Sequence, residues 1–223
     1  MILYGSPVSP FVQRVLIAAA VKGHRLPVGA PPGGTMQAPE FLAIAPLGRI
    51  PVLALGDGRH LSESGAIVDY LDAALEGPAL IPADPWERGR AREIEAIAGL
   101  EVAAGLRPAL FGRGFKMPID AAVCEAGLAQ YERGLAALDR LIDRDGRYAI
   151  GDVPSVADLL LGPTLAMAAT IDPWAPALAA IAAHPALEAY RRRLAEDPLF
   201  TPAAAQIDGL AAYIAAKHQE KPQ

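Results

Sequence analysis

The most informative sequence in this chain of 223 residues is LGRIPVLALGDGRHLSESGAIVDYL, which runs from Leu47 to Leu71. Pro51 opens an apolar run that ends at the turn Gly56–Gly58, and such a turn between apolar runs predicts a β-hairpin. The hydroxyl-acid-hydroxyl triplet Ser62–Ser64 then opens a segment with helical periodicity. These features predict a backbone that pairs with a small peptide and a helix N-terminus that binds a carboxylate. A plain hydrophobic core requires neither feature.

The residues on either side of this stretch predict alternating strands and helices. Apolar residues recur at helical spacing in Pro10–Val21, and its first residue is a proline, which suits a first helical turn. The segment Ala30–Gln37 is rich in Pro and Gly and predicts a loop. The expected elements, in order, are strand Ile2–Tyr4, helix Pro10–Val21, strand His24–Val28, short helix Pro39–Ile44, hairpin strands Pro51–Leu55 and Arg59–Leu61, and helix Ser64–Leu75.

The second part of the chain predicts helices only. Glu76–Pro85 holds three prolines and one glycine, a composition typical of a linker. We expect a first domain at 1–76, a linker at 77–85 and an all-helical domain at 86–223. The expected helices are Trp86–Leu110, Asp120–Asp143, Val156–Thr170, Pro176–Ala183, Pro185–Glu196 and Pro202–Lys217, with breaks at Gly112–Pro118, Asp145–Pro154 and Asp172-Pro173.

Composition excludes several classes of function. The net charge is −5 and neither half is basic, which argues against a nucleic-acid partner. Cys124 is the only cysteine, so no intrachain disulfide forms, and the four histidines lack metal-ligand spacing. The longest apolar run, Leu159–Ile171, is too short to span a membrane, and we expect no signal peptide. We expect a cytoplasmic protein without a metal.

Four motifs follow one another along the chain. They are SPFVQRV at Ser9–Val15, PEFL at Pro39–Leu42 leading to PLGRIPVL at Pro46–Leu53, SESGAI at Ser62–Ile67, and GDVPSVAD at Gly151–Asp158. In this order and spacing they resemble the cytosolic glutathione transferase superfamily, in particular bacterial-type members with a serine at the thiol position. The resemblance covers nearly the whole chain. It implies a thioredoxin-like glutathione-binding domain, a helical domain that contributes the electrophile pocket, and a homodimer.

By this resemblance, Ser9 faces the sulfur of glutathione. A thiol with a pKa near ~8.5 is mostly protonated at neutral pH, and lowering that pKa by ~2 units takes about 2.7 kcal/mol. One charge-assisted hydrogen bond supplies ~1.5–3 kcal/mol, and the dipole of the following helix adds to it. The structural alternative is that Ser9 only caps this helix. Ser6 and Tyr4 are rival hydroxyls.

The resemblance also implies roles for the residues that flank the hairpin. Pro51 would follow a cis peptide bond and leave the backbone of Ile50 to pair with the cysteinyl part of glutathione. Glu63 would accept the α-ammonium group, and Ser64 would bind the γ-glutamyl carboxylate at the helix N-terminus. The structural alternatives are a proline at a strand start and ordinary helix capping by Ser62 or Ser64.

The glycyl end of glutathione is the weakest part of the predicted site. Arg49 is the candidate for its carboxylate, and a solvated surface arginine is the alternative. Many relatives carry a basic residue near position 43, where this chain has Ala43. Gln37 and His24 are weaker candidates for the same role.

Other polar residues are expected to be structural. We interpret Arg14 as a structural residue of the first helix, Ser155 and Asp158 as a capping pair, and Cys124 as a packing residue. The apolar side chains available for a second substrate are Leu106, Phe111, Phe115 and Trp174.

Three functions fit this sequence. The first is a glutathione transferase that moves alkyl or aryl groups onto glutathione and uses a small apolar electrophile. The second is a glutathione-dependent isomerase or lyase of small acids, with Arg113 as an anchor. The third is a non-catalytic binding or regulatory protein with the same fold, which the absence of a basic residue at Ala43 keeps open.

Overall fold

The computed structural model describes residues 1–171 and 176–219 and divides into two compact units, Met1–Ile81 and Pro82–Gln223. The predicted break at Asp172-Pro173 and the candidate lining residue Trp174 lie outside the described residues.

The first unit has the predicted order of elements and a mixed four-stranded sheet. The strands lie in the order β2-β1-β3-β4, with β1 parallel to β2 and antiparallel to β3, and β3 antiparallel to β4. This is the thioredoxin-like arrangement that the resemblance implied. Its elements are β1 Ile2–Tyr4, α1 Pro10–Val21, β2 Val28–Gly29, the 3₁₀ turn η1 Pro32–Gly34, α2 Pro39–Leu42, β3 Val52–Ala54, β4 His60–Ser62 and α3 Ser64–Ala74.

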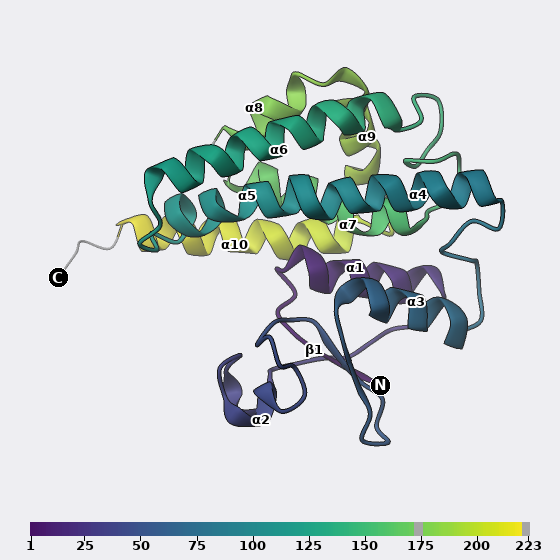
Figure 1. Cartoon of the computed structure of the whole chain (residues 1–223), viewed down its shortest axis with the longest axis vertical. Helices are drawn as coiled ribbons and strands as arrows, with labels where there is room; N and C mark the ends of the chain where they lie inside the picture. Colours follow the sequence, from purple (N-terminus) through teal and green to yellow (C-terminus); the bar gives the residue numbers. More distant parts are fainter. Residues whose placement is uncertain (172–175, 220–223) are drawn as a thin grey trace. The chain divides into compact units, whose positions relative to one another are not determined.

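Helices cover both faces of this sheet. Successive residues of a strand point to opposite faces. Tyr4 and Val52 are register partners, and both pack with Phe41 of α2. Leu3 and Leu53, the neighbouring pair, point the other way and are fully buried. Helices α1 and α3 lie side by side on that second face (Figure 1).

The strand predicted at His24–Val28 is shorter and lies later in the chain. Only Val28–Gly29 pairs with β1. Pro27 precedes it, has no N–H to donate, and offers its carbonyl to the amide of Leu3 at 2.9 Å. His24 and Arg25 are exposed.

Part of the predicted linker is held within the first unit. Asp72 of α3 forms an ion pair with buried Lys22, at 2.7 Å between Nζ and Oδ1. The same Oδ1 accepts a hydrogen bond from the backbone amide of Leu80 at 2.9 Å. The side chain of Leu80 is fully buried. These contacts explain why the first compact unit extends to Ile81.

All the regular secondary structure that the structure describes in the second unit is helical. Helical structure is continuous from Pro85 to Gly114. The break predicted at Gly112–Pro118 is present, but it begins at Phe115 and not at Gly112. A Cβ on Gly112 would lie 2.8 Å from Sγ of Cys124 in α6, so this glycine permits close packing and does not end the helix. The elements are α4 Pro85–Ile97, the π-helical η2 Ala98–Ala103, α5 Ala104–Ala109, the π-helical η3 Leu110–Gly114, α6 Ala121–Leu141, α7 Val156–Ile171, α8 Ala177–Ala182, α9 Pro185–Ala195 and α10 Thr201–Gln219.

Helix α7 is buried along most of its length, and Asp158 in its first turn is 0% exposed. Oδ2 of Asp158 accepts from the amide and the hydroxyl of Ser155, at 2.9 and 3.2 Å. Oδ1 accepts from the amide of Ala149 at 2.8 Å and from the hydroxyl of Tyr190 at 2.9 Å. The predicted capping pair is confirmed, and it is part of a larger buried network.

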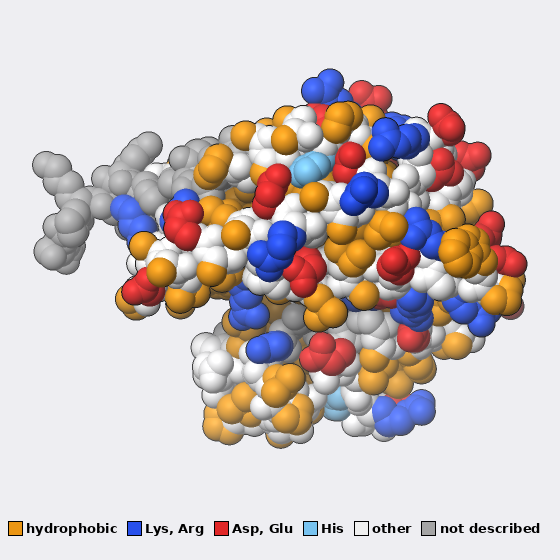
Figure 2. All heavy atoms as spheres, turned by 45° about the horizontal axis from the view of Figure 1, so that its top comes forward, with side chains coloured by type: hydrophobic (Ala, Val, Ile, Leu, Met, Phe, Trp, Pro, Cys, Tyr) orange, Lys and Arg blue, Asp and Glu red, His pale blue; other side chains and the backbone are white. Residues whose placement is uncertain are grey.

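Charged side chains of both signs are interspersed on the face of the molecule shown in Figure 2. Among the helices that the structure describes, none combines the length and the apolar character needed to cross a bilayer.

Candidate active site

Ser9 lies at the N-terminus of α1, in extended conformation (φ −78°, ψ 127°), and is half-buried. Its carbonyl accepts the first helical amides, from Val12 at 3.0 Å and Gln13 at 2.9 Å. Its hydroxyl makes no capping hydrogen bond to the amides of α1, all of which belong to the described residues. The structural alternative, in which this hydroxyl caps the helix, is therefore not what the structure contains.

The two rival hydroxyls have different surroundings. Tyr4 packs in the apolar cluster with Phe41 and Val52, on the face of the sheet that α2 covers. Ser6 lies in the loop before α1, and its carbonyl accepts the amide of Ser9 at 3.0 Å. That loop is also held by the side-chain amide of Gln13, which donates to the carbonyl of Pro7. Ser6 remains the rival that an experiment has to separate from Ser9.

The peptide bond between Ile50 and Pro51 is cis. Ile50 is half-buried and precedes β3, whose register with β1 and β4 begins at Val52. Gly48, two residues before Ile50, has φ +57°. A Cβ on Gly48 would lie 2.9 Å from the carbonyl oxygen of Met36. Glycine is therefore required two residues before Ile50.

The N-terminus of α3 holds the next two predicted site residues. Glu63 is exposed and has φ +69°, a left-handed conformation that is uncommon for a residue with a side chain. Such conformations cluster at functional sites. Ser64 begins α3 and is 5% exposed.

Arg14 of α1 contacts Ser64, and the sequence interpretation missed this. Its Nη1 donates to Oγ of Ser64 at 3.3 Å, and Arg14 is itself 5% exposed. One signal was present in the sequence, because a charged residue between the apolar Val12 and Val15 needs a polar partner when it is buried. The partner lies fifty residues further along the chain, and the sequence pattern does not identify it.

The candidates for the glycyl end lie on different parts of the first unit. Arg49 is exposed. Gly48 precedes Arg49 in the chain, and Nε2 of Gln37 lies 3.3 Å from the position that a Cβ on Gly48 would take. Ala43 is exposed at the C-terminus of α2. His24 follows the C-terminus of α1, about 18 Å of helix away from Ser9.

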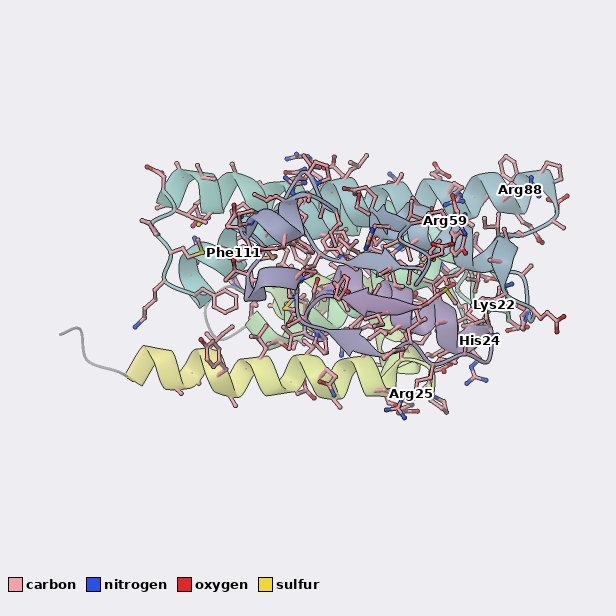
Figure 3. All side chains as sticks on the ribbon, turned by 90° about the horizontal axis from the view of Figure 1, so that it is seen from below. Lys22, His24, Arg25, Arg59, Arg88 and Phe111 are labelled. Carbon is pink, nitrogen blue, oxygen red and sulfur yellow. The ribbon has the colours of Figure 1, made fainter. Side chains whose placement is uncertain are left out.

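The second unit contains an aromatic pair at the end of its first long helical segment. The ring centroids of Phe111 and Phe115 are 5.7 Å apart, and the guanidinium of Arg107 lies 5.5 Å from the centre of the Phe111 ring. Figure 3 shows Phe111 near one end of this segment and Arg88 near the other. Arg113 forms an ion pair with Glu125 of α6. Leu106 is buried.

Two observations concern potential metal ligands and the single cysteine. Among the described residues, no group of three or more His, Cys, Asp or Glu side chains is placed to hold a metal ion. Cys124 is buried and donates to the carbonyl of Pro108 at 3.4 Å, as expected of a packing residue.

Sequence comparisons agree with this geometry. Residues 3–79 match the family described as glutathione S-transferase, N-terminal domain, and residues 120–193 match glutathione S-transferase, C-terminal domain. The chain is 33% identical over 186 residues to a maleylacetoacetate isomerase of Pseudomonas aeruginosa, covering 78% of this chain and 87% of that protein. The chain belongs to the glutathione S-transferase superfamily.

Other members of the superfamily are similar over most of their length. A glutathione S-transferase of Pseudomonas putida is 30% identical over 196 residues, covering 88% of this chain and 87% of that protein. The crystal structure of a glutathione S-transferase from Methylobacillus flagellatus KT with GSH bound has a TM-score of 0.74 and 28% identity, covering 90% of this chain and 97% of that one. The protein is thus a glutathione-dependent enzyme of the glutathione S-transferase superfamily.

Proposed function

We propose that this protein is a glutathione transferase that binds reduced glutathione through residues 1–76 and activates its thiol for attack on a small apolar electrophile. The observation that carries the proposal is the Ser9 hydroxyl, which stands at the start of α1 and is not used to cap that helix. A hydroxyl donor and the positive end of a helix dipole both stabilise a thiolate over a thiol.

Each part of glutathione has a proposed partner. Ser9 donates to the thiolate, and the backbone of Ile50 pairs with the cysteinyl residue beside cis Pro51. Glu63 accepts the α-ammonium group, and Ser64 with the α3 N-terminus binds the γ-glutamyl carboxylate. Arg49 pairs with the glycyl carboxylate. The positions of Glu63 and Ser64 at one helix end support this assignment.

The helical domain at 86–223 is proposed to contribute the electrophile pocket. The apolar pair Phe111 and Phe115, together with Leu106, supports an apolar co-substrate. By the resemblance we also propose a homodimer, which sedimentation analysis would test.

The decisive experiment compares Ser9→Ala with Ser6→Ala in a conjugation assay with an aryl halide. We expect Ser9→Ala to lower kcat by about 10–100-fold, because it removes one charge-assisted hydrogen bond to the thiolate. The Kd for glutathione, measured well below the pKa of the bound thiol, should change by less than about twofold, because the lost donor stabilises the thiolate and not the thiol. Ser6→Ala is the matched control and should leave kcat and the Kd for glutathione nearly unchanged.

Equal turnover by wild type and Ser9→Ala would show that Ser9 does not activate the thiol. A loss of turnover in Ser6→Ala alone would assign this role to Ser6.

A glutathione-dependent isomerase of small acids is the second candidate, and the isomerase from Pseudomonas aeruginosa supports it. Arg113, the anchor suggested for an acidic substrate, is already paired with Glu125, whereas Arg107 lies over an aromatic ring. Small dicarboxylates should compete with the aryl halide if this candidate is correct. If they do not compete, the transferase is favoured.

The non-catalytic alternative makes a third, separate prediction. A binding protein that has lost the glutathione site would show no heat of binding when titrated calorimetrically with millimolar glutathione. That result would contradict both enzymatic candidates.

A further inference from the structure

We propose that Arg14 is a positioning residue that holds the hydroxyl of Ser64 as a donor toward the γ-glutamyl carboxylate of glutathione. This inference rests on the proposed function, because it concerns the residue behind the proposed carboxylate site and adds a residue to that site. It begins from one contact, in which Nη1 of Arg14 lies 3.3 Å from Oγ of Ser64.

The first step is the direction of this hydrogen bond. A guanidinium has donors only, whereas a serine hydroxyl has one donor and two acceptor lone pairs. Arg14 therefore fixes Ser64 as the acceptor in their contact. The proton of the Ser64 hydroxyl is left to point to another acceptor. A carboxylate accepts and does not donate, so it is the ligand group that this orientation suits.

The second step is the rigidity of the arrangement. Arg14 and Ser64 are each 5% exposed, so the guanidinium approaches α3 from within the unit. The fully buried side chains of Val12 and Val15, which flank Arg14 on α1, restrict its backbone. A hydroxyl that is oriented before the ligand arrives loses less conformational entropy on binding. The guanidinium stays protonated at every working pH, so this donor is permanent.

The third step is the space that the chain leaves for Arg14. Gly65 follows Ser64 in the first turn of α3. A Cβ at this glycine would lie 3.3 Å from Nη2 and 3.5 Å from Nη1 of Arg14. The 3.3 Å separation is tighter than ordinary van der Waals contact, so a side chain at position 65 would push the guanidinium away by a few tenths of an ångström. The glycine thus permits the close approach of Arg14 to the helix start.

The test measures binding of two ligands by calorimetry. One ligand is glutathione, and the other is an analogue in which the γ-glutamyl α-carboxylate is replaced by a carboxamide. We expect Arg14→Met to raise the Kd for glutathione about 10-fold and the Kd for the carboxamide less than twofold. Arg14→Lys keeps a charged donor and should restore the Kd for glutathione to within about threefold of the wild type.

A merely structural role for Arg14 gives a different pattern. If Arg14→Met weakens binding of both ligands by the same factor, or of neither, the inference is overturned. Ser64→Ala should give the same selective loss as Arg14→Met, and the double variant should show no further loss, because both act through one hydroxyl. Additive losses would overturn the inference. In turnover assays, KM for glutathione should rise while kcat stays within about twofold.

If Arg14→Met does not fold, a second variant with a smaller structural change tests the same inference. Gly65→Ala moves the guanidinium through its new Cβ and should raise the Kd for glutathione about 2–5-fold without affecting the carboxamide. Gly89→Ala in α4 is the matched control, because nothing lies within 4 Å of its Cβ position. Equal effects of these two variants would contradict the inference. A wild-type protein that binds neither ligand would overturn the proposed function as well, whereas binding of glutathione without selectivity in the variants overturns only the role of Arg14.

Discussion

Helices α3 and α7 both begin with a serine and an acidic residue, and the two ends are built in opposite ways. At α7, both oxygens of Asp158 accept hydrogen bonds from groups within the unit, and the residue is fully buried. At α3, Glu63 is exposed with φ +69°, and Ser64 is held from behind by Arg14.

This difference distinguishes a helix start whose acidic residue is satisfied within the unit from one that we propose to bind a ligand. The amides at a helix N-terminus need acceptors, from the chain itself or from a ligand. The acidic residue of α7 accepts from its own unit and is shut off from solvent, whereas that of α3 faces outward. A short motif of Ser and Asp or Glu therefore does not by itself reveal which role it has.

The largest expected effect comes from breaking the α7 end. Asp158→Ala removes four accepted hydrogen bonds and leaves the amide of Ala149 and the hydroxyl of Tyr190 buried without this partner. Each orphaned buried donor costs about 1–3 kcal/mol, so the free energy of unfolding should fall by more than about 3 kcal/mol. Urea denaturation would measure it. The matched control is Asp120→Ala at the exposed start of α6, where loss of one cap costs about 1 kcal/mol. Equal losses in the two variants would contradict a special role for burial.

Tyr148 precedes Ala149, whose amide donates to Asp158 at the start of α7. Tyr148 is 4% exposed, and its hydroxyl donates to Oδ2 of Asp197 at 2.8 Å. Burial, together with Asp197, raises the pKa of Tyr148 to about 12 from its ordinary value of 10. A raised folded-state pKa contributes stability that is present below the unfolded pKa and is lost as the pH rises through the folded one.

Stability should therefore fall between about pH 10 and pH 12, by up to about 1.4 kcal/mol for each pKa unit. Urea midpoints measured at pH 9, 10.5 and 11.5 would test this, with Tyr148→Phe as the comparison. The variant lacks the titrating hydroxyl, so its midpoint should depend less steeply on pH over this window. Parallel curves for the two proteins would exclude Tyr148 as the cause.

The contrast between the two helix ends also explains which predictions from sequence were accurate. The bounds of α1 were predicted to the residue, because Pro10 and Gly23 mark them locally. The capping pair of α7 was predicted because its members lie three residues apart. Local chemistry was sufficient in both cases.

Features that depend on distant partners were missed. The contact between Arg14 and Ser64 joins residues fifty positions apart. Gly112 was interpreted as a helix breaker, whereas it makes room for Cys124 of a neighbouring helix. The short β2 is set by its pairing with β1, which the apolar pattern at His24–Val28 does not contain. Ser9, Glu63 and Ser64 were proposed from motifs, and their roles stay predictions.

The smallest expected change in stability is at the start of α3, and it is a gain, whereas the changes predicted above are losses. Glu63→Gly relieves a left-handed conformation that costs about 1–2 kcal/mol for a residue with a side chain. Glycine also increases the entropy of the unfolded chain, which offsets about 0.5–1 kcal/mol. The free energy of unfolding should therefore rise slightly, by up to about 1 kcal/mol. The Kd for glutathione should increase about 10-fold, because the proposed acceptor of the α-ammonium group is lost.

Lys116→Gly is the matched control, since Lys116 also has a positive φ, of 55°. It should give a similar gain in stability with an unchanged Kd. A Glu63→Gly protein that is less stable and binds glutathione as tightly as the wild type would show that the α3 end, like the α7 end, is built for the fold alone.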